Sequence, residues 1–242
     1  MKYIKFVLLI FTLVFSVSLF GCSGEQKINK TVEELKTEIR TVFDAYSASD
    51  HGNFKMIAVN GDKTSTVDMI YNYDDDKSGI LSLKTLLTSD QGTMSCYVIE
   101  QDAYINRYDQ SKTIVKVNSK EGEIIANDYS FDAFTKYINV MLGDSFFNSL
   151  EITSFKDNVL TANLSIGRYD ISGEEESDIL TEVFEGIVCK TSVTLEVVYN
   201  ETGVASVKVV LVGEETASIE VQFIEVSEEN IDIEYPDFSD YK

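Results

Sequence analysis

The chain has 242 residues, of which 41 are acidic, 20 are Lys or Arg and one is His, so its formal net charge is −21. A surface this acidic repels nucleic acid and other anionic polymers, which excludes nucleic-acid binding. The length is sufficient for one β-rich domain with an ample hydrophobic core.

The first residues are organised like an export signal. Lys2 and Lys5 precede an apolar run of 15 residues, Phe6–Phe20. As a helix this run would measure about 22 Å, whereas the hydrocarbon core of a bilayer is about 30 Å thick. A basic start followed by a short apolar run is typical of a cleaved signal peptide. We therefore expect residues 1–21 to be a signal peptide that takes no part in the fold.

The sequence LFGC at Leu19–Cys22 resembles the bacterial lipobox, in which the cysteine thiol receives a diacylglyceryl group and becomes the first residue of the mature chain. Gly21 fits this pattern, whereas Phe20 stands where a small residue is usual. The resemblance implies lipidation of Cys22 and an anchor in the membrane. Two alternatives stay open, namely ordinary secretion after cleavage near Ser16–Ser18 and an uncleaved N-terminal anchor.

Cleavage before Cys22 would leave 221 residues with 18 basic and 41 acidic side chains, a net charge of −23. Such a charge keeps a tethered domain soluble beside a bilayer. Residues 22–30 are polar and unpatterned and are predicted to be a tether, whereas residues 31–242 are predicted to form a single domain. The remaining thiols, Cys96 and Cys189, lie in strand-like runs. Two core thiols are favoured over a disulfide, which export would permit.

An amphipathic helix is predicted to begin at Thr31. Thr31 and Glu34 have the spacing of a capping box. Apolar residues then recur at intervals of three and four, which is the pattern of one helix face. They are Val32, Leu35, Ile39, Val42, Phe43 and Tyr46. The segment Ser47–Asn53 breaks the pattern, and the single histidine, His51, is predicted to be solvated in this loop.

Most of the remaining chain alternates between apolar and polar residues, which predicts half-buried antiparallel strands. The clearest early examples are Val67–Tyr73 and Met94–Val98, and the sequence EQDAYIN at Glu100–Asn106 is predicted to be a turn. A later strand is predicted at Leu160–Ile166.

Two segments return to helical spacing. Phe131–Met141 is predicted to be a helix with Ser130 as its N-cap and Gly143 as its stop. A second helix is predicted around Ile179–Phe184, closed by Gly186.

The C-terminal region is predicted to be an antiparallel meander, because consecutive alternating runs are joined by short polar turns. Its strands are Val193–Tyr199, Val204–Val212 and Ile219–Phe223, followed by a short final strand at Ile231–Tyr235. In the sequence VKVVLV, at 207–212, apolar residues point to both faces, so both faces are expected to be covered.

Motifs for catalysis and metal binding are scarce. The chain has no P-loop, GxSxG, HExxH or CxxC pattern, and one imidazole at His51 cannot build a His-based triad or a two-His metal site. We therefore predict no enzyme and no cofactor. Asp74, Asp76 and Ser78 match the opening of a calcium loop, but its twelfth position is Thr85 rather than a bidentate acid. An acidic hairpin turn is predicted, with these three residues as weak candidates for binding a cation.

The order of these features resembles the LolA/LolB-like lipoproteins, including LppX/LprG-type and Gram-positive members. The features are the lipobox, an amphipathic helix, antiparallel strands interrupted by helices, and a meander ending in IDIEYPDF. The resemblance covers about Lys30–Tyr241 and transfers no functional residue. It implies an α+β fold in which a strongly curved antiparallel β-sheet, a half-barrel, wraps around a few amphipathic helices. It also implies that an acyl chain could bind in the apolar hollow between them.

Two functions follow as hypotheses. In the first, the chain is a membrane-anchored extracytoplasmic lipoprotein that binds or carries a lipid or another apolar ligand. The inward-facing residues of the meander would then line the cavity, and the candidates are Leu195, Val197, Val221 and Phe223. In the second, it is a tethered interaction or sensor module with a solid core and no ligand. A sizeable apolar cavity would favour the first hypothesis.

Overall fold

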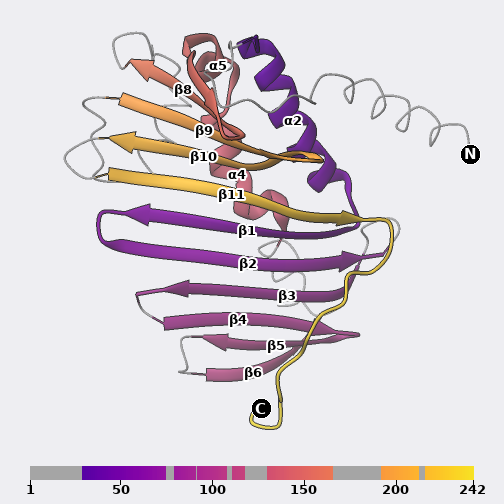
Figure 1. Cartoon of the computed structure of the whole chain (residues 1–242). Coiled ribbons are helices and arrows are strands. Elements are labelled where there is room, and N and C mark those ends of the chain that lie inside the picture. Colours follow the sequence, from indigo (N-terminus) through magenta and orange to yellow (C-terminus); the bar gives the residue numbers. More distant parts are fainter. Residues whose placement is uncertain are drawn as a thin grey trace, which may run out of the picture.

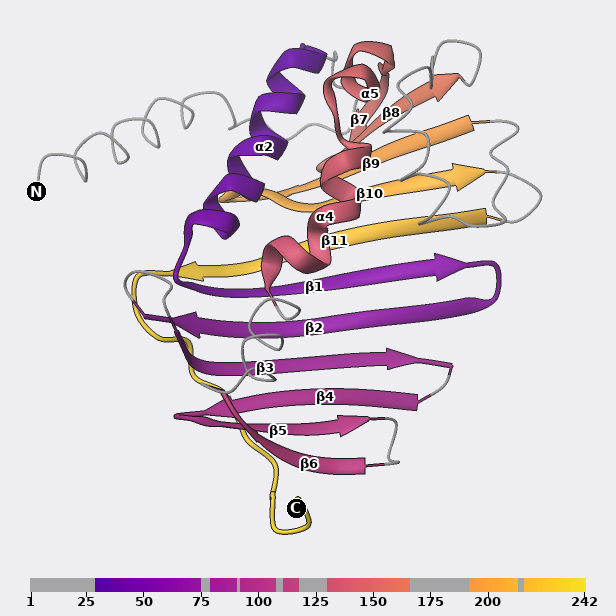
Figure 2. The ribbon, with the colours of Figure 1, turned by 180° about the vertical axis from the view of Figure 1, so that it is seen from behind.

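The computed structural model describes residues 29–74, 79–90, 92–107, 111–117, 130–165, 192–212 and 216–242. Within these ranges the strands form one antiparallel sheet of 11 strands in the order β6-β5-β4-β3-β2-β1-β11-β10-β9-β8-β7. Figures 1 and 2 show that the sheet is strongly curved and carries the described helices on one face, here called the inner face. This arrangement confirms the predicted α+β fold.

The elements have the following bounds. The helices are α2 (Val32–Ala48), α4 (Phe131–Met141) and α5 (Asp144–Ser149). The first six strands are β1 (His51–Asn60), β2 (Lys63–Tyr73), β3 (Ile80–Ser89), β4 (Gly92–Ile99), β5 (Asp102–Arg107) and β6 (Ser111–Lys116). The last five are β7 (Glu151–Lys156), β8 (Val159–Ser165), β9 (Ser192–Asn200), β10 (Gly203–Val212) and β11 (Thr216–Ser227).

The topology explains why the helices lie across the sheet. Strands β1 to β6 build one half outward from the centre, and β7 to β11 build the other half inward until β11 pairs with β1. Consequently β6 and β7, which follow each other in the chain, are the two opposite edges. The connection between them has to cross the whole sheet, and it contains α4 and α5. The first helix, α2, precedes the central strand β1 and packs beside them.

The first helix forms as predicted. The Glu34 backbone N–H donates to Thr31 Oγ1 at 3.2 Å, and the Thr31 N–H donates to Glu34 Oε2 at 2.7 Å, which completes the capping box. The Thr31 N–H and the Thr31 hydroxyl, which donates to Glu34 Oε2 at 2.9 Å, both lower the pKa of the Glu34 carboxyl. Four of the six predicted stripe residues are fully buried: Leu35, Ile39, Phe43 and Tyr46.

The second predicted helix is also confirmed. The Ser130 Oγ accepts from the Ala133 N–H at 3.1 Å as an N-cap, and α4 ends at Met141, two residues before Gly143. Gly143 is in addition the N-cap of α5, a short helix that the periodicity did not predict. The predicted helix around Ile179–Phe184 lies outside the described residues.

Aromatic side chains form the contact between the helices and the inner face. Phe131 of α4 lies 4.9 Å from Phe54 of β1 and 5.1 Å from Tyr46 of α2, measured between ring centroids. Phe43 of α2 lies 5.2 Å from Phe223 of β11. Edge-to-face and tilted ring pairs at these distances are favourable beyond their buried area.

The strand predictions are confirmed for β2, β4, β8 and the meander β9–β10–β11, with Ile166 outside the described residues. The predicted turn at Glu100–Asn106 is wrong. It is reduced to Glu100 and Gln101, and Asp102–Arg107 form β5. The segment has the alternating burial of a strand, because Ala103 and Ile105 point inward and are buried, with 0% and 4% exposure.

His51 is not solvated, contrary to the prediction. It is the first residue of β1, it pairs with Asn72 on one side and Ser227 on the other, and only 9% of its surface is exposed. The reason is that β1 begins at His51 in the middle of the sheet, where side chains of β2 and β11 flank the imidazole on both sides.

The predicted final strand at Ile231–Tyr235 is also wrong. Residues 228–242 form no strand and cross the outer face, opposite the helices (Figure 1). The chain leaves β11 in the middle of the sheet, where β1 and β10 already occupy both edges of β11, so Ile231–Tyr235 have no free edge beside it to join.

The expectation that β10 is covered on both faces holds only on the inner face. Val207, Val209 and Leu211 are buried there, whereas Val210 and Val212 on the outer face are half-buried. Neighbouring side chains of β9 and β11 cover these valines in part, and no helix is needed.

Candidate functional site

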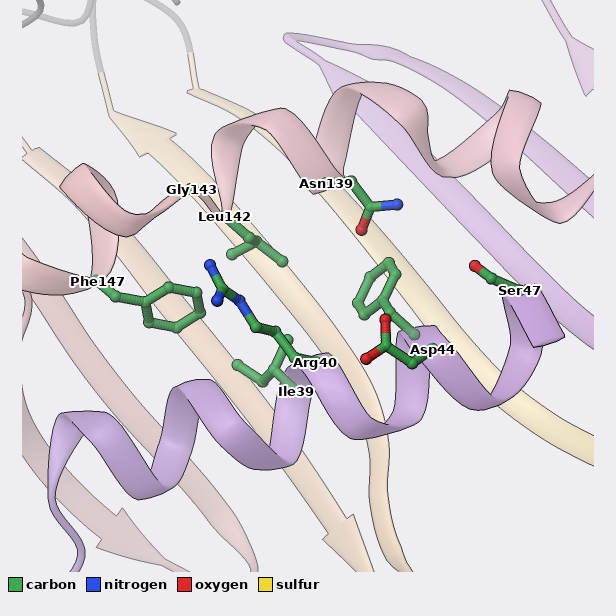
Figure 3. A pocket seen from close by; sticks show the side chains of 9 residues that line it. Ile39, Arg40, Asp44, Ser47, Asn139, Leu142, Gly143 and Phe147 are labelled. Atoms are coloured by element: carbon green, nitrogen blue, oxygen red, sulfur yellow. The ribbon is translucent and has the colours of Figure 1, made fainter.

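A groove of about 420 Å³ lies between α2 on one side and α4 with α5 on the other (Figure 3). Both walls come from segments far apart in the sequence, and strands of the sheet lie beneath them. The lining residues are Ile39, Arg40, Phe43, Asp44, Ser47, Asn139, Leu142, Gly143 and Phe147.

The groove has an apolar floor and a polar rim. Ile39 and Phe43 lie one turn apart on the buried face of α2, and Phe147 of α5 is fully buried. Arg40, Asp44 and Ser47 occupy the adjacent strip of α2, because a helix turns by 3.6 residues and places these positions beside the buried face. An amphiphile with an apolar chain and a polar end matches this division.

Polar contacts connect the two walls at both ends of the groove. Asp144 of α5 accepts from Lys36 Nζ at 2.9 Å and pairs with Arg40, both on α2. The hydrogen bonds from Lys36 and then Arg40 lower the pKa of the Asp144 carboxyl. At the other end, Ser47 Oγ donates to Asp132 Oδ1 at 2.6 Å. Asp144, Arg40 and Asp132 are exposed, whereas Lys36 and Ser47 are half-buried, so solvent weakens each contact on at least one side.

The sequence-predicted cavity residues lie deeper than this groove. Leu195 and Val197 of β9 and Val221 of β11 are completely buried on the inner face, and Phe223 of β11 is 9% exposed. None of them lines the groove. Phe223 contacts Phe43, which does line it, so the meander residues belong to the layer beneath the groove floor.

The polar and apolar residues of the α4–α5 wall were missed by sequence reasoning. Asn139, Leu142, Gly143 and Phe147 belong to two helices whose approach to α2 depends on the whole topology. The available local signal was the adjacent apolar pair Phe146–Phe147 after Gly143. Because α5 has six residues, it is too short to show a helical period in its sequence.

The acidic turn behaves as a hairpin connection in the part that the structure describes. Asp74 Oδ1 accepts from the Gly79 N–H at 3.0 Å, and the Asp74 N–H donates to the Gly79 carbonyl at 3.1 Å. Asp76 and Ser78 lie outside the described residues. Among the described residues no group of three or more His, Cys, Asp or Glu side chains is placed to hold a metal ion.

Of the three cysteines, Cys96 lies within the described residues. Cys96 is a free thiol on the inner face of β4 with no exposed surface, and burial raises its pKa to about 12. It is therefore a core residue rather than a nucleophile. Cys22 and Cys189 lie outside the described residues. No helix in the described ranges is long and apolar enough to cross a membrane.

Fold and groove together define a class of protein, an open curved antiparallel sheet with an amphipathic groove between the helices on its inner face. No family model matches the chain, and no curated protein matches it. Similar solved structures exist, and each has 8% sequence identity to the chain.

One is a LolA superfamily protein from Nitrosomonas europaea, with 78% of this chain and 94% of that chain covered at a TM-score of 0.22. Another is a DUF1329 family protein from Desulfovibrio piger, with 80% and 94% covered at a TM-score of 0.22. A third is described as an outer membrane lipoprotein-sorting protein domain from Vibrio parahaemolyticus, with 81% and 93% covered at a TM-score of 0.21. Similarity at this level defines no family for the chain.

Proposed function

We propose that this chain is a lipid-anchored protein of the extracytoplasmic face of a bacterial membrane, and that it binds a lipid or another apolar ligand between α2 and α4–α5. The groove of about 420 Å³ is the observation that supports the proposal. Its volume lies within the range of about 300–1,000 Å³ that is usual for small-molecule sites.

An acyl chain suits the floor of this groove. The chain would contact Ile39, Phe43, Leu142 and Phe147, which are 0–5% exposed here, so the helices would have to move apart to admit it. Each methylene transferred from water into apolar surroundings gains about 0.8 kcal/mol. The meander residues Leu195, Val197, Val221 and Phe223 would form the second apolar layer, which a longer chain reaches when the helices move apart. This movement would open the contacts of Asp144 and Asp132 with α2 and would also separate the Phe131 ring of α4 from Tyr46 and Phe43 of α2.

The anchor is the second part of the proposal. Residues 1–21 would be removed as a signal peptide, a diacylglyceryl group on Cys22 would hold the protein in the membrane, and residues 22–30 would be the tether to a single domain of residues 31–242. We propose no catalytic activity and no cofactor. A Gram-positive source is proposed because the anchor would then hold the domain outside the cell.

Lipidation is tested by changing Cys22. The wild-type protein is expected to sediment with membranes and to incorporate labelled fatty acid, because the thiol is the attachment point. Cys22→Ala is expected to incorporate none and to accumulate uncleaved or be released. Equal incorporation by both proteins would contradict lipidation, and ordinary secretion would then be the better account of the N-terminus.

Ligand binding is tested by filling the groove. Asn139 is an exposed lining residue, so Asn139→Trp should occupy the groove with little loss of stability. We expect the chain without its signal peptide to take up a fluorescent fatty acid, and we expect the variant to bind it about tenfold more weakly, a loss of about 1.4 kcal/mol.

The matched control is Thr41→Trp, which places the same ring on an exposed position of α2 outside the groove. It should bind like the wild type. Equal weakening in both variants would show that the ring acts through stability, and no weakening in Asn139→Trp would remove the groove as the binding site.

The second candidate function is a tethered interaction or sensor module with a solid core. It is favoured by the nearly complete burial of the inner-face residues, including Leu195, Val197 and Val221. Native mass spectrometry separates the two candidates. Lipid retained through purification supports the carrier, whereas a ligand-free protein that also fails to take up the fatty acid supports the interaction module.

A further inference from the structure

Residues 228–242, here called the C-terminal arm, cross the outer face of strands β2 to β6 (Figure 1). The arm begins at a two-bond contact with β2, in which the Ile231 N–H donates to Asn72 Oδ1 at 2.8 Å and Asn72 Nδ2 donates to the Ile231 carbonyl at 2.9 Å. Beyond this contact the arm is held by side chains and by its last residue.

Three aromatic side chains of the arm, three residues apart, dock on two tyrosines of the sheet. Phe238 stacks on Tyr104 of β5 with a centroid distance of 4.1 Å and an interplanar angle of 23°. Tyr241 meets the same ring edge-on at 5.7 Å, and Tyr235 lies 6.1 Å from Tyr97 of β4. Tyr97 points to the outer face and is 7% exposed, with Tyr235 and Phe238 of the arm packed against its ring.

The end of the arm occupies the edge of the sheet. The Ile114 N–H of β6 donates to the Lys242 carbonyl at 3.2 Å, and the Lys242 N–H donates to the Lys112 carbonyl at 3.3 Å. These are the bonds that an added strand would make with an open edge. The Lys112 side chain pairs with Asp240 and lies over the ring of Tyr241, at 5.6 Å from its centroid.

The arm makes few buried contacts for its length. No residue from 228 to 242 is buried, and Tyr235 is 39% exposed. Segments with few buried contacts and exposed backbone hydrogen bonds detach locally without global unfolding. A detached arm would uncover Tyr97, Tyr104 and the β6 edge together.

We propose that the outer face of β4–β6 with the β6 edge is a peptide-docking surface, and that its partner is the arm of a second copy of this chain. The surface fits an extended segment with aromatic residues every third position and carboxylates between them, which the arm sequence YPDFSDY provides. An identical arm from another copy makes the same contacts, so exchange forms new dimer contacts at little net cost.

Thiol trapping tests the exchange in the chain without its signal peptide and Cys22, with Cys189→Ser and with the buried Cys96 retained. Lys112→Cys and Asp240→Cys are made in separate chains, so neither chain holds a facing pair. Mild oxidation of the mixture should give a disulfide-linked dimer of the two different chains. Phe238→Ala in the Asp240→Cys chain should reduce that dimer about tenfold, since it removes the stacked ring.

The double variant with both cysteines in one chain is the control for cis docking, and each single variant alone is the control for random collisions. A double variant that cross-links within itself, together with a mixture that gives no more dimer than the single variants, would overturn the proposal and show a fixed arm. A double variant that cross-links neither within one chain nor between two chains would also overturn the proposal, because the arm would then not occupy this surface.

Discussion

Replacing Phe131 by alanine is expected to destabilise the protein by about 3–5 kcal/mol, the usual cost of removing a buried phenylalanine. Phe131 is 3% exposed and stands in the first turn of α4, where its ring contacts Phe54, Tyr46 and Phe43 at centroid distances of 4.9, 5.1 and 5.9 Å. The loss would leave a cavity where α4, α2 and the sheet meet. Because α4 is one wall of the groove, fatty-acid uptake should also decrease.

The measurement is urea unfolding followed by circular dichroism in the far and near ultraviolet. Phe134→Ala is the matched control, because this ring belongs to the same helix, is half-buried and lies 6.4 Å from Phe54. It should cost clearly less. An equal loss in the two variants would contradict a central role for the Phe131 contacts.

Gly52→Ala is expected to destabilise the protein by about 1–3 kcal/mol through overpacking. Gly52 lies opposite Tyr71 in the β1–β2 pair, and a Cβ at position 52 would lie 2.4–2.7 Å from Tyr71 ring and hydroxyl atoms. The ring cannot easily move away, since it is 1% exposed and its hydroxyl donates to the Tyr46 carbonyl at 2.8 Å. Burial also raises the pKa of the Tyr71 hydroxyl, so it stays neutral as a donor.

A double-mutant cycle with Tyr71→Leu isolates this clash. Leucine removes the ring atoms that the new methyl group would meet, so Gly52→Ala should cost little in that background. The two substitutions should therefore be non-additive by about 1 kcal/mol or more in the free energy of unfolding. The same cost in both backgrounds would locate the effect in the backbone of β1 instead.

The candidate site was only partly predictable. The sequence contains the apolar stripe of α2, and Ile39 and Phe43 of that stripe became the groove floor. The opposite wall was not visible, because α5 has six residues and its position depends on a connection that crosses from one sheet edge to the other. The meander residues Val221 and Phe223, predicted to line a cavity, are buried on the inner face and do not line the groove.

Local patterns were sufficient where each residue needs only its near neighbours in the chain. The capping box at Thr31, the helix stripes and the alternation in β2, β4 and β9 to β11 follow from backbone geometry over a few residues, so they could be read directly. The pairing of β1 with β11 joins residues more than 150 positions apart, and no local pattern reports it. That one pairing puts His51 inside the sheet and leaves the chain directly after Ser227 without a free edge beside β11. The arm therefore docks across the outer face through its aromatic residues, although IDIEY alternates like a strand.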